Sequence, residues 1–420
     1  MKPRKRLLAL GIGILLLLGA CGEADPPGEE PADTADEPAD MTDDPDDPEQ
    51  ATTADGEPIV IGVLEDRTGP GSFFSQQAVS VIRLSIEQVN EDGGVLGRPI
   101  ELIFEDDQAD PTLSASLVRR MIENGAVAIL NQSGSASAIQ AKPVLEEEQV
   151  PGLAPTNLST DIINEPHADW SFIVPNPITD IATVYVDAYE AAGIETIAFA
   201  FDDDATLVGL TEDFMIPYFE ERGIVVVAAE ALPPDASDIT AEISRLRDAD
   251  PDGVFMASFG GPLEPMVYNT MQTLGWEVPR FSLASIGNMP DTWDLADDGA
   301  LDGVVFSGSI SAENELAQDL EALLREELDG FEHMTAFHAQ AWDAIQLLVQ
   351  AIEDAGVAEG PAIRDALENV AVDATFGQPG HTLNFTPDKH MATGGLCGIV
   401  LVQFEGNEPG DPWDVYQPSC

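Results

Sequence analysis

The sequence predicts an α/β protein of two lobes, each built as a parallel sheet flanked by helices. From residue 59 onward, apolar strand-like runs alternate with segments whose apolar residues recur at helical spacing. This alternation is typical of parallel sheets covered by helices. The alternating region, 57–420, is longer than one compact core usually serves. Two lobes are therefore expected.

The expected strands share an apolar run bounded by turn residues or by a helical segment. They are 59–64, 100–104, 126–130, 194–201, 224–229, 253–257, 304–307 and 396–404. The expected helices include 76–89, a helix starting at Pro111 with Asp110 as its N-cap, and a long helix near 335–355. The alternation is interrupted at 175–177, where we place the division between the two halves.

The N-terminus has the organisation of a secretory signal. Basic residues among the first six precede an apolar run at 7–18. This run is too short to span a bilayer, which takes a helix of roughly 20 residues. The run ends Leu-Gly-Ala-Cys at Cys21, which resembles a bacterial lipobox, so 1–21 is predicted to be a lipoprotein signal peptide and Cys21 the lipidated residue. The alternative is an ordinary secreted protein in which Cys21 falls there by chance.

Residues 22–56 contain 14 acidic residues, no Lys or Arg, and almost no large apolar residue. Such a segment cannot bury enough apolar surface to offset the entropy of ordering it. We predict a disordered acidic tether that holds the folded part away from the membrane surface.

The chain is strongly acidic, with 17 basic and 77 acidic residues and a formal net charge of −60. This charge excludes nucleic acid as a partner. An acid-rich, lysine-poor composition resembles that of proteins from salt-adapted organisms, and we expect salt to screen the self-repulsion. Acidic drift in a GC-rich genome is the alternative.

Besides Cys21, the chain has two cysteines, Cys397 and Cys420. In an oxidising compartment they are expected to form a disulfide. Two free thiols are the alternative.

Motifs of enzymes and metal sites are missing from the sequence. There is no G-x-S-x-G, H-E-x-x-H, P-loop or strand-linked G-x-G-x-x-G, so we predict that the chain is not an enzyme and needs no cofactor or metal. The three aspartates 202–204 lack the spaced ligands of a calcium loop and are predicted to lie in a solvated loop at the end of a strand.

Two polar turns suit a small-molecule ligand. Residues 131–137 and 155–159 follow expected strands and are rich in hydroxyl and amide side chains. Ligands of open α/β sheets bind outside the carboxyl ends of strands, where helix N-termini favour carboxylates. Plain loops with N-cap residues are the alternative.

Three motifs follow one another over 58–112. They are Thr68-Gly69-Pro70, Asn90 followed by Gly93-Gly94-Val95-Leu96-Gly97, and Asp106-Asp107-Gln108-Ala109-Asp110-Pro111. With these motifs, residues 58–112 resemble the start of the leucine/isoleucine/valine-binding proteins, which are receptors of branched-chain amino acid ABC transporters. The resemblance continues over essentially all of 57–420.

The resemblance implies a type I periplasmic binding protein fold with a three-strand hinge. The first lobe would then comprise 57–176 and 311–380, and the second lobe 177–310 and 381–420. It also implies a monomer whose two lobes close over a small molecule.

The resemblance also implies positions for ligand contacts. In the first lobe these are Ser135 with Ser137 for a carboxylate, Thr156, Asn157 and Leu158 for an ammonium, and Phe74 for the ligand side chain. Phe74 could instead be a core residue. In the second lobe the matching positions are Val208, Phe259 and Ser285, where this chain lacks the two tyrosines and the acid of the family.

The function implied is that of a lipid-anchored receptor on the extracytoplasmic face of the cell membrane. It would deliver a branched-chain amino acid, or a related small carboxylate or amide, to an ABC permease. A sensory or regulatory lipoprotein of the same fold, without a transport role, is the alternative.

Overall fold

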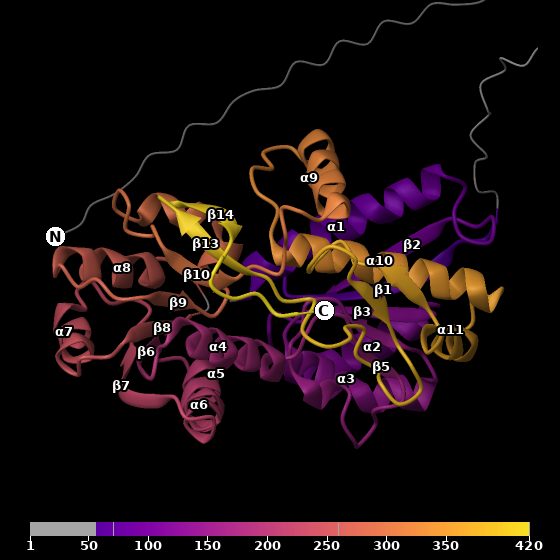
Figure 1. Cartoon of the computed structure of the whole chain (residues 1–420). Helices are drawn as coiled ribbons and strands as arrows, with labels where there is room; N and C mark the ends of the chain where they lie inside the picture. Colours follow the sequence, from indigo (N-terminus) through magenta and orange to yellow (C-terminus); the bar gives the residue numbers. More distant parts are fainter. Residues whose placement is uncertain (1–55, 70, 259, 420) are drawn as a thin grey trace, which may run out of the picture. The chain divides into compact units, whose positions relative to one another are not determined.

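The computed structural model describes residues 56–69, 71–258 and 260–419, without the side chains of 205 and 206 (Figure 1). The described residues form two large sheets, each with parallel strands and helices on both faces, and one two-stranded sheet. The predicted α/β class is confirmed. The expectations for Cys21, Phe259, Cys420 and 1–55 concern residues outside the described ones.

The first sheet has the strand order β2-β1-β3-β4-β5, and every pairing is parallel. Its strands are β1 (Ile59–Glu65), β2 (Ile100–Asp106), β3 (Ala128–Gln132), β4 (Gly152–Ala154) and β5 (Ser171–Ile173). Val63 pairs with Phe104 on one side and Leu130 on the other, so β1 lies between two strands. Because the strands are parallel, their carboxyl ends share one edge.

Helices cover both faces of this sheet (Figure 1). One core holds α1 (Ser72–Glu91) against α10 (Ala336–Ala355). Beside them lie α9 (Glu315–Glu327), α11 (Gly360–Leu367) and the pair of β11 (Ala371–Asp373) with β12 (Thr382–Asn384). The opposite core holds α2 (Pro111–Glu123) and α3 (Ser135–Glu148), and the short helix η1 (Thr160–Ile162) lies beside α3.

The second sheet has the order β14-β13-β10-β9-β8-β6-β7; β13 pairs antiparallel with both β10 and β14, and the other pairings are parallel. Its strands are β6 (Thr196–Asp202), β7 (Val225–Leu232), β8 (Gly253–Ala257), β9 (Arg280–Ser282), β10 (Val304–Ser307), β13 (Leu401–Glu405) and β14 (Glu408–Pro412). Its helices are α4 (Ile178–Ala192), α5 (Ala205–Val208), η2 (Gly209–Met215), α6 (Ile216–Glu221), α7 (Thr240–Asp248), α8 (Leu263–Thr273), η3 (Ile286–Asn288) and η4 (Pro290–Leu295).

The chain passes between the two lobes three times. The passages follow β5, β10 and the segment that ends near Ala392. One boundary differs from the prediction, which assigned 381–420 to the second lobe. Leu383, Phe385 and Ala392 pack in the core of the first lobe, because β12 pairs with β11 beneath α10.

Most predicted elements are present with small shifts in their bounds. Asp110 accepts a hydrogen bond from the Thr112 N–H, which confirms it as the N-cap of α2. The predicted strand at 396–404 is wrong at its start, because Leu396 and Ile399 close a turn and β13 begins only at Leu401.

Candidate functional site

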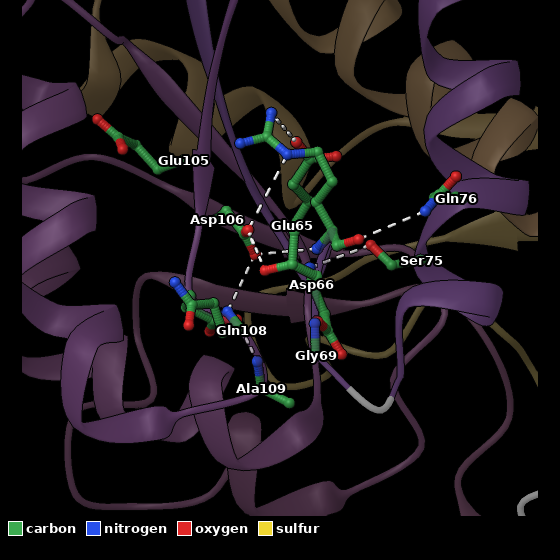
Figure 2. Close-up of polar contacts among 12 residues, drawn as sticks. Glu65, Asp66, Gly69, Ser75, Gln76, Glu105, Asp106, Gln108 and Ala109 are labelled. Carbon is green, nitrogen blue, oxygen red and sulfur yellow. Dashed lines mark hydrogen bonds and ion pairs between the residues drawn. The ribbon is translucent and has the colours of Figure 1, made fainter. Parts of the chain in front are cut away.

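Carboxylates hold the first two loops at the carboxyl edge of the first sheet, Asp66 within the first loop and Asp106 between the two loops (Figure 2). Asp66 accepts hydrogen bonds from the Gly69 and Gly71 N–H groups, each at 2.6 Å. Asp106 accepts from Thr68 Oγ1 at 2.7 Å. A Cβ on Gly69 would lie 2.3 Å from the Gln108 carbonyl oxygen, so only glycine fits at this close approach.

Asp107 joins the β2 loop to the turn after β3. The residue is fully buried. Its Oδ1 accepts from Ser133 Oγ at 2.6 Å and from the Ala109 N–H at 3.1 Å, and its Oδ2 accepts from Ser114 Oγ at 3.0 Å. A buried carboxylate with several donors holds its neighbours in place, since losing it would leave each donor unpaired.

The two polar turns predicted from the sequence lie together. Asn157 Nδ2 donates to the Ser133 carbonyl at 2.8 Å, and Gln132 Nε2 donates to Thr156 Oγ1 at 2.8 Å. Ser133 Oγ also lies 3.4 Å from Ser137 Oγ. The structure therefore brings together the candidates Ser137, Thr156 and Asn157.

Ser133 and Gln132 connect these candidates, and sequence reasoning did not single them out as site residues. The available signal was their place at the end of a buried strand, within the turn that was predicted to bind a ligand.

The N-terminus of α3 provides hydrogen-bond donors beside this cluster. Its N-cap is Gly134, which has no side chain to cap the helix. Within the described part of the chain, the N–H groups of Ser135 and Ala136 and the half-buried Ser135 hydroxyl have no hydrogen-bond partner. Free N–H groups at the positive end of a helix attract an anion.

Buried acceptors lie in the same pair of turns. Asn157 Oδ1 and Gln132 Oε1 are enclosed and have no hydrogen-bond partner. The Asn157 amide orientation is unambiguous, because its Nδ2 donates to a carbonyl oxygen that can only accept. An unpaired buried acceptor costs about 1–3 kcal/mol, so a donor supplied at this point would be stabilised.

Two further first-lobe candidates lie in apolar surroundings. Phe74 is half-buried on α1, with ring centroids 5.7 Å from Phe73 and 5.1 Å from Phe337. Leu158 packs against the core of the second lobe, and its carbonyl accepts from the Ile178 N–H at 3.2 Å. Leu158 therefore lies where the chain first passes between the lobes.

In the second lobe, the candidate Ser285 contacts a buried acid that sequence reasoning missed. Ser285 Oγ donates to Glu264 Oε2 at 2.5 Å, and Tyr268 Oη donates to Glu264 Oε1 at 3.1 Å. Burial raises the Glu264 pKa to about 7, and the negative charge of Asp202 adds to the shift. The available signal was an acid in the first turn of a helix directly after a strand-end glycine pair.

Val208 and the three aspartates 202–204 are the other second-lobe residues singled out from the sequence. Val208 is half-buried at the end of α5, packed against the second-lobe core. Asp203 and Asp204 are exposed, as expected, but Asp202 is buried and accepts from Ser258 Oγ at 3.1 Å. The solvated-loop prediction is therefore wrong for Asp202, because it is the last residue of β6 and lies inside the sheet edge.

Among the described residues, no hydrogen bond joins Val208 or Ser285 to the polar turns of the first lobe. Over the same residues, no group of three or more His, Cys, Asp or Glu side chains is placed to hold a metal ion. No helix in that part is long and apolar enough to cross a membrane. Cys397 is disulfide-bonded, and its pairing with Cys420 stays a prediction.

Two α/β lobes linked by three chain passages form the architecture of type I periplasmic binding proteins. A family model described as Periplasmic binding protein matches residues 58–405. The chain therefore belongs to the periplasmic binding protein family, and it is related to the binding proteins of branched-chain amino acid transporters.

Three comparisons illustrate this relationship. Leu/Ile/Val-binding protein BraC3 of Rhizobium johnstonii is 24% identical over 337 residues, covering 77% of this chain and 88% of the relative. The chemotactic signal transduction system substrate-binding protein BasB of Halobacterium salinarum is 23% identical over 342 residues, covering 78% of this chain and 77% of the relative. The branched-chain amino acid transporter substrate binding protein LivJ of Streptococcus pneumoniae, solved with isoleucine, superposes with a TM-score of 0.70 at 17% identity, covering 84% and 98%.

Proposed function

We propose that this protein is an extracytoplasmic receptor that binds a small amino acid between its two lobes and delivers it to an ABC importer. A branched-chain amino acid is the first candidate ligand, because BraC3 and LivJ carry that specificity in their names. The proposal gives the chain a binding role without catalysis.

The observation that carries the proposal is the pairing of free donors with free acceptors at the carboxyl edge of the first sheet. The N-terminus of α3 and the Ser135 hydroxyl offer donors suited to a carboxylate. Asn157 Oδ1 and Gln132 Oε1 offer buried acceptors suited to an ammonium group. An α-amino acid carries both groups on a single carbon atom, so it complements this edge.

The second lobe has an acid beside the position where the resemblance implies one. The expected position, Ser285, holds a serine, but Glu264 lies against its hydroxyl. We assign Glu264 the electrostatic role of that missing acid when the lobes close over a cationic amino group. Val208 and the position of Phe259 replace the family's tyrosines, so the apolar wall of this lobe differs from that of the family.

Isothermal titration calorimetry of the full chain tests the proposal. The panel is L-leucine, L-isoleucine and L-valine, their amides, the decarboxylated amines, and aromatic acids. We expect saturable binding of at least one free amino acid, and weaker binding of both the amide and the amine, which lack the carboxylate. No binding by any branched-chain amino acid would overturn this choice of ligand, and equal binding of the amides and amines would overturn the assignment of the α3 donors to a carboxylate.

The lipid anchor is part of the proposal. A diacylated Cys21 followed by an acidic coil would keep the receptor near a membrane permease and so raise its effective concentration. Metabolic labelling with a fatty acid, compared between the wild type and Cys21→Ser, tests this. Equal labelling would exclude Cys21 as the lipidated residue.

A sensory receptor is the second candidate function, and the relationship to BasB favours it. In that case the ligand-bound protein would contact a membrane transducer rather than a permease. Permease and ATPase genes beside the gene for this chain would support transport, and a transducer gene in that place would support sensing.

A further inference from the structure

The two lobes contact each other at a point away from the three chain passages. Asn288 lies at the end of η3 in the second lobe and is 3% exposed. Its Oδ1 accepts from the Ala336 N–H of α10 at 3.0 Å, and its backbone carbonyl accepts from Gln77 Nε2 of α1 at 3.0 Å. Both α1 and α10 belong to the first lobe.

The orientation of the Asn288 amide is unambiguous. Its Nδ2 donates to the Ala284 carbonyl oxygen at 2.9 Å, and a carbonyl can only accept. Its Oδ1 is therefore the atom that faces the Ala336 N–H, which can only donate. The first N–H groups of a helix have no partner within the helix, so Asn288 acts as a cap for α10 that comes from the other lobe.

Gln77 closes a ring of contacts around this cap. Its Oε1 accepts from Thr335 Oγ1 at 2.5 Å, while its Nε2 is bonded to Asn288. Thr335, the residue before α10, uses its N–H to donate to His338 Nδ1 at 3.0 Å. The Thr335 hydroxyl also lies 2.8 Å from His338 Nδ1 and takes part in a capping box with His338, while the Ala336 N–H donates to Asn288.

A second interlobe contact lies beside this ring. Trp293 packs in the second-lobe core, and its ring centroid lies 4.7 Å from that of His333, in the segment that leads into α10. Phe74 lies one turn before Gln77 on α1 and contacts Phe337, the second residue of α10. The interlobe ring therefore adjoins the side chain expected to contact a ligand.

We propose that Asn288, Gln77 and Thr335 form an interlobe contact that holds the lobes together, with Asn288 as the positioning residue that couples closure to the start of α10. Opening the lobes must break the Asn288–Ala336 and Asn288–Gln77 bonds at once. Removing either bond is expected to shift the closing equilibrium by about fivefold, the effect of one ordinary hydrogen bond. The inference concerns closure of the lobes and requires no particular ligand.

The test uses two NMR signals of the full chain without added ligand. Hydrogen exchange of the Ala336 amide, followed after alanine-selective ¹⁵N labelling, reports the cap. The fluorine resonance of Trp293, among the five tryptophans labelled with 5-fluorotryptophan and assigned with Trp293→Phe, reports the contact with His333.

In the wild type we expect a protected Ala336 amide. In Asn288→Ala, this amide should exchange at least about tenfold faster, since its acceptor is gone, and the Trp293 resonance should move. Gln77→Leu, made in the opposite lobe, should move the Trp293 resonance in the same direction. Both variants act on one equilibrium from different lobes, so their agreement does not depend on how well either one folds.

Asn314→Ala is the matched control. Asn314 is also a buried asparagine, at 4% exposure, and its Oδ1 also accepts from an N-terminal helix amide, that of Leu316 at 3.1 Å. Its Nδ2 donates to the Ala374 and Thr375 carbonyls, so these side-chain contacts lie within the first lobe. This variant should leave both signals unchanged.

An unprotected Ala336 amide in the wild type would overturn the inference. Unchanged signals in Asn288→Ala would do so as well, as would a loss of Ala336 protection with no movement of the Trp293 resonance, because the cap would then act without closing the lobes. None of these outcomes bears on whether an amino acid binds, so failure here is distinct from failure of the proposed function.

Discussion

At the residue scale, Glu264 is the position with the clearest chemical consequence. Its carboxyl group is enclosed by Ser285, Tyr268 and the end of β9, and the hydrogen bonds described for it come from hydroxyl groups. Enclosure among neutral groups favours the protonated acid, and burial raises the pKa of Glu264 from 4.5 to about 7. The same group that would attract an amino group therefore destabilises the empty protein at neutral pH.

The sign of the pH effect follows from this shift. Because the folded pKa lies above the unfolded one, the folded state binds the proton more tightly between pH 4.5 and about 7. The contribution of Glu264 to stability is fully present below pH 4.5 and is lost as the pH rises through 7. Glu264→Gln has the same shape and no charge. The difference in free energy of unfolding between this variant and the wild type should therefore grow by about 3 kcal/mol in favour of the variant from pH 4 to pH 8.

Urea unfolding at both pH values measures this difference. Glu123→Gln, on the exposed face of α2, is the control, and its stability should follow that of the wild type at both values. Equal differences between Glu264→Gln and the wild type at pH 4 and pH 8 would contradict the buried-acid account.

The residues of the candidate site were only partly predictable from the sequence. Thr156 and Asn157 could be singled out because hydroxyl and amide side chains directly after a strand are typical of a ligand-binding sheet edge. The contact of Glu264 with Ser285 could not be predicted, because the two residues are 21 apart in the sequence and the contact depends on how distant elements pack. The contact of Gln77 with Asn288 spans 211 residues, and no local pattern encodes it.

At the element scale, local sequence determined the long, regular elements well. The predicted strand at 304–307 matches β10, and the predicted helix near 335–355 matches α10, because continuous apolar runs and helical periodicity are local properties. The N-cap at Asp110 could be predicted for the same reason, because its partner Thr112 is only two residues away in the sequence.

The elements that sequence reasoning missed are short or depend on distant partners. The strands β5 and β9 each have three residues, and each is stabilised by a parallel neighbour beside it. The pair β11–β12 was missed for the same reason. Without it, the predicted lobe boundary assigned 381–392 to the second lobe, although these residues pack with the first. Tertiary pairing, rather than intrinsic propensity, decides such strands.

At the scale of the whole molecule, net charge is the dominant feature. Of the formal net charge of −60, about −50 belongs to residues 57–420, once the 14 acidic residues of 22–56 and the four basic residues of 1–21 are set aside. Repulsion among so many like charges opposes compaction, and salt shortens its range from about 30 Å at 0.01 M to about 3 Å at 1 M.

The melting temperature of the full chain should therefore rise between low salt and about 1 M KCl, with most of the rise in the first few hundred millimolar, where screening changes most. Differential scanning calorimetry at a series of KCl concentrations measures it. A melting temperature that stays level or falls over this series would show that acidic repulsion does not limit stability.

The central claim is that the turn at the start of α3 binds the carboxylate of the ligand. Calorimetric titration of Ser135→Ala with the tightest-binding amino acid of the panel tests it most directly, with Ser116→Ala on the exposed side of α2 as the matched serine control. Loss of a hydrogen bond to a charged group should weaken binding by at least about 1 kcal/mol, or roughly fivefold, in Ser135→Ala. The control should bind as the wild type does. Unchanged affinity in Ser135→Ala would contradict the account.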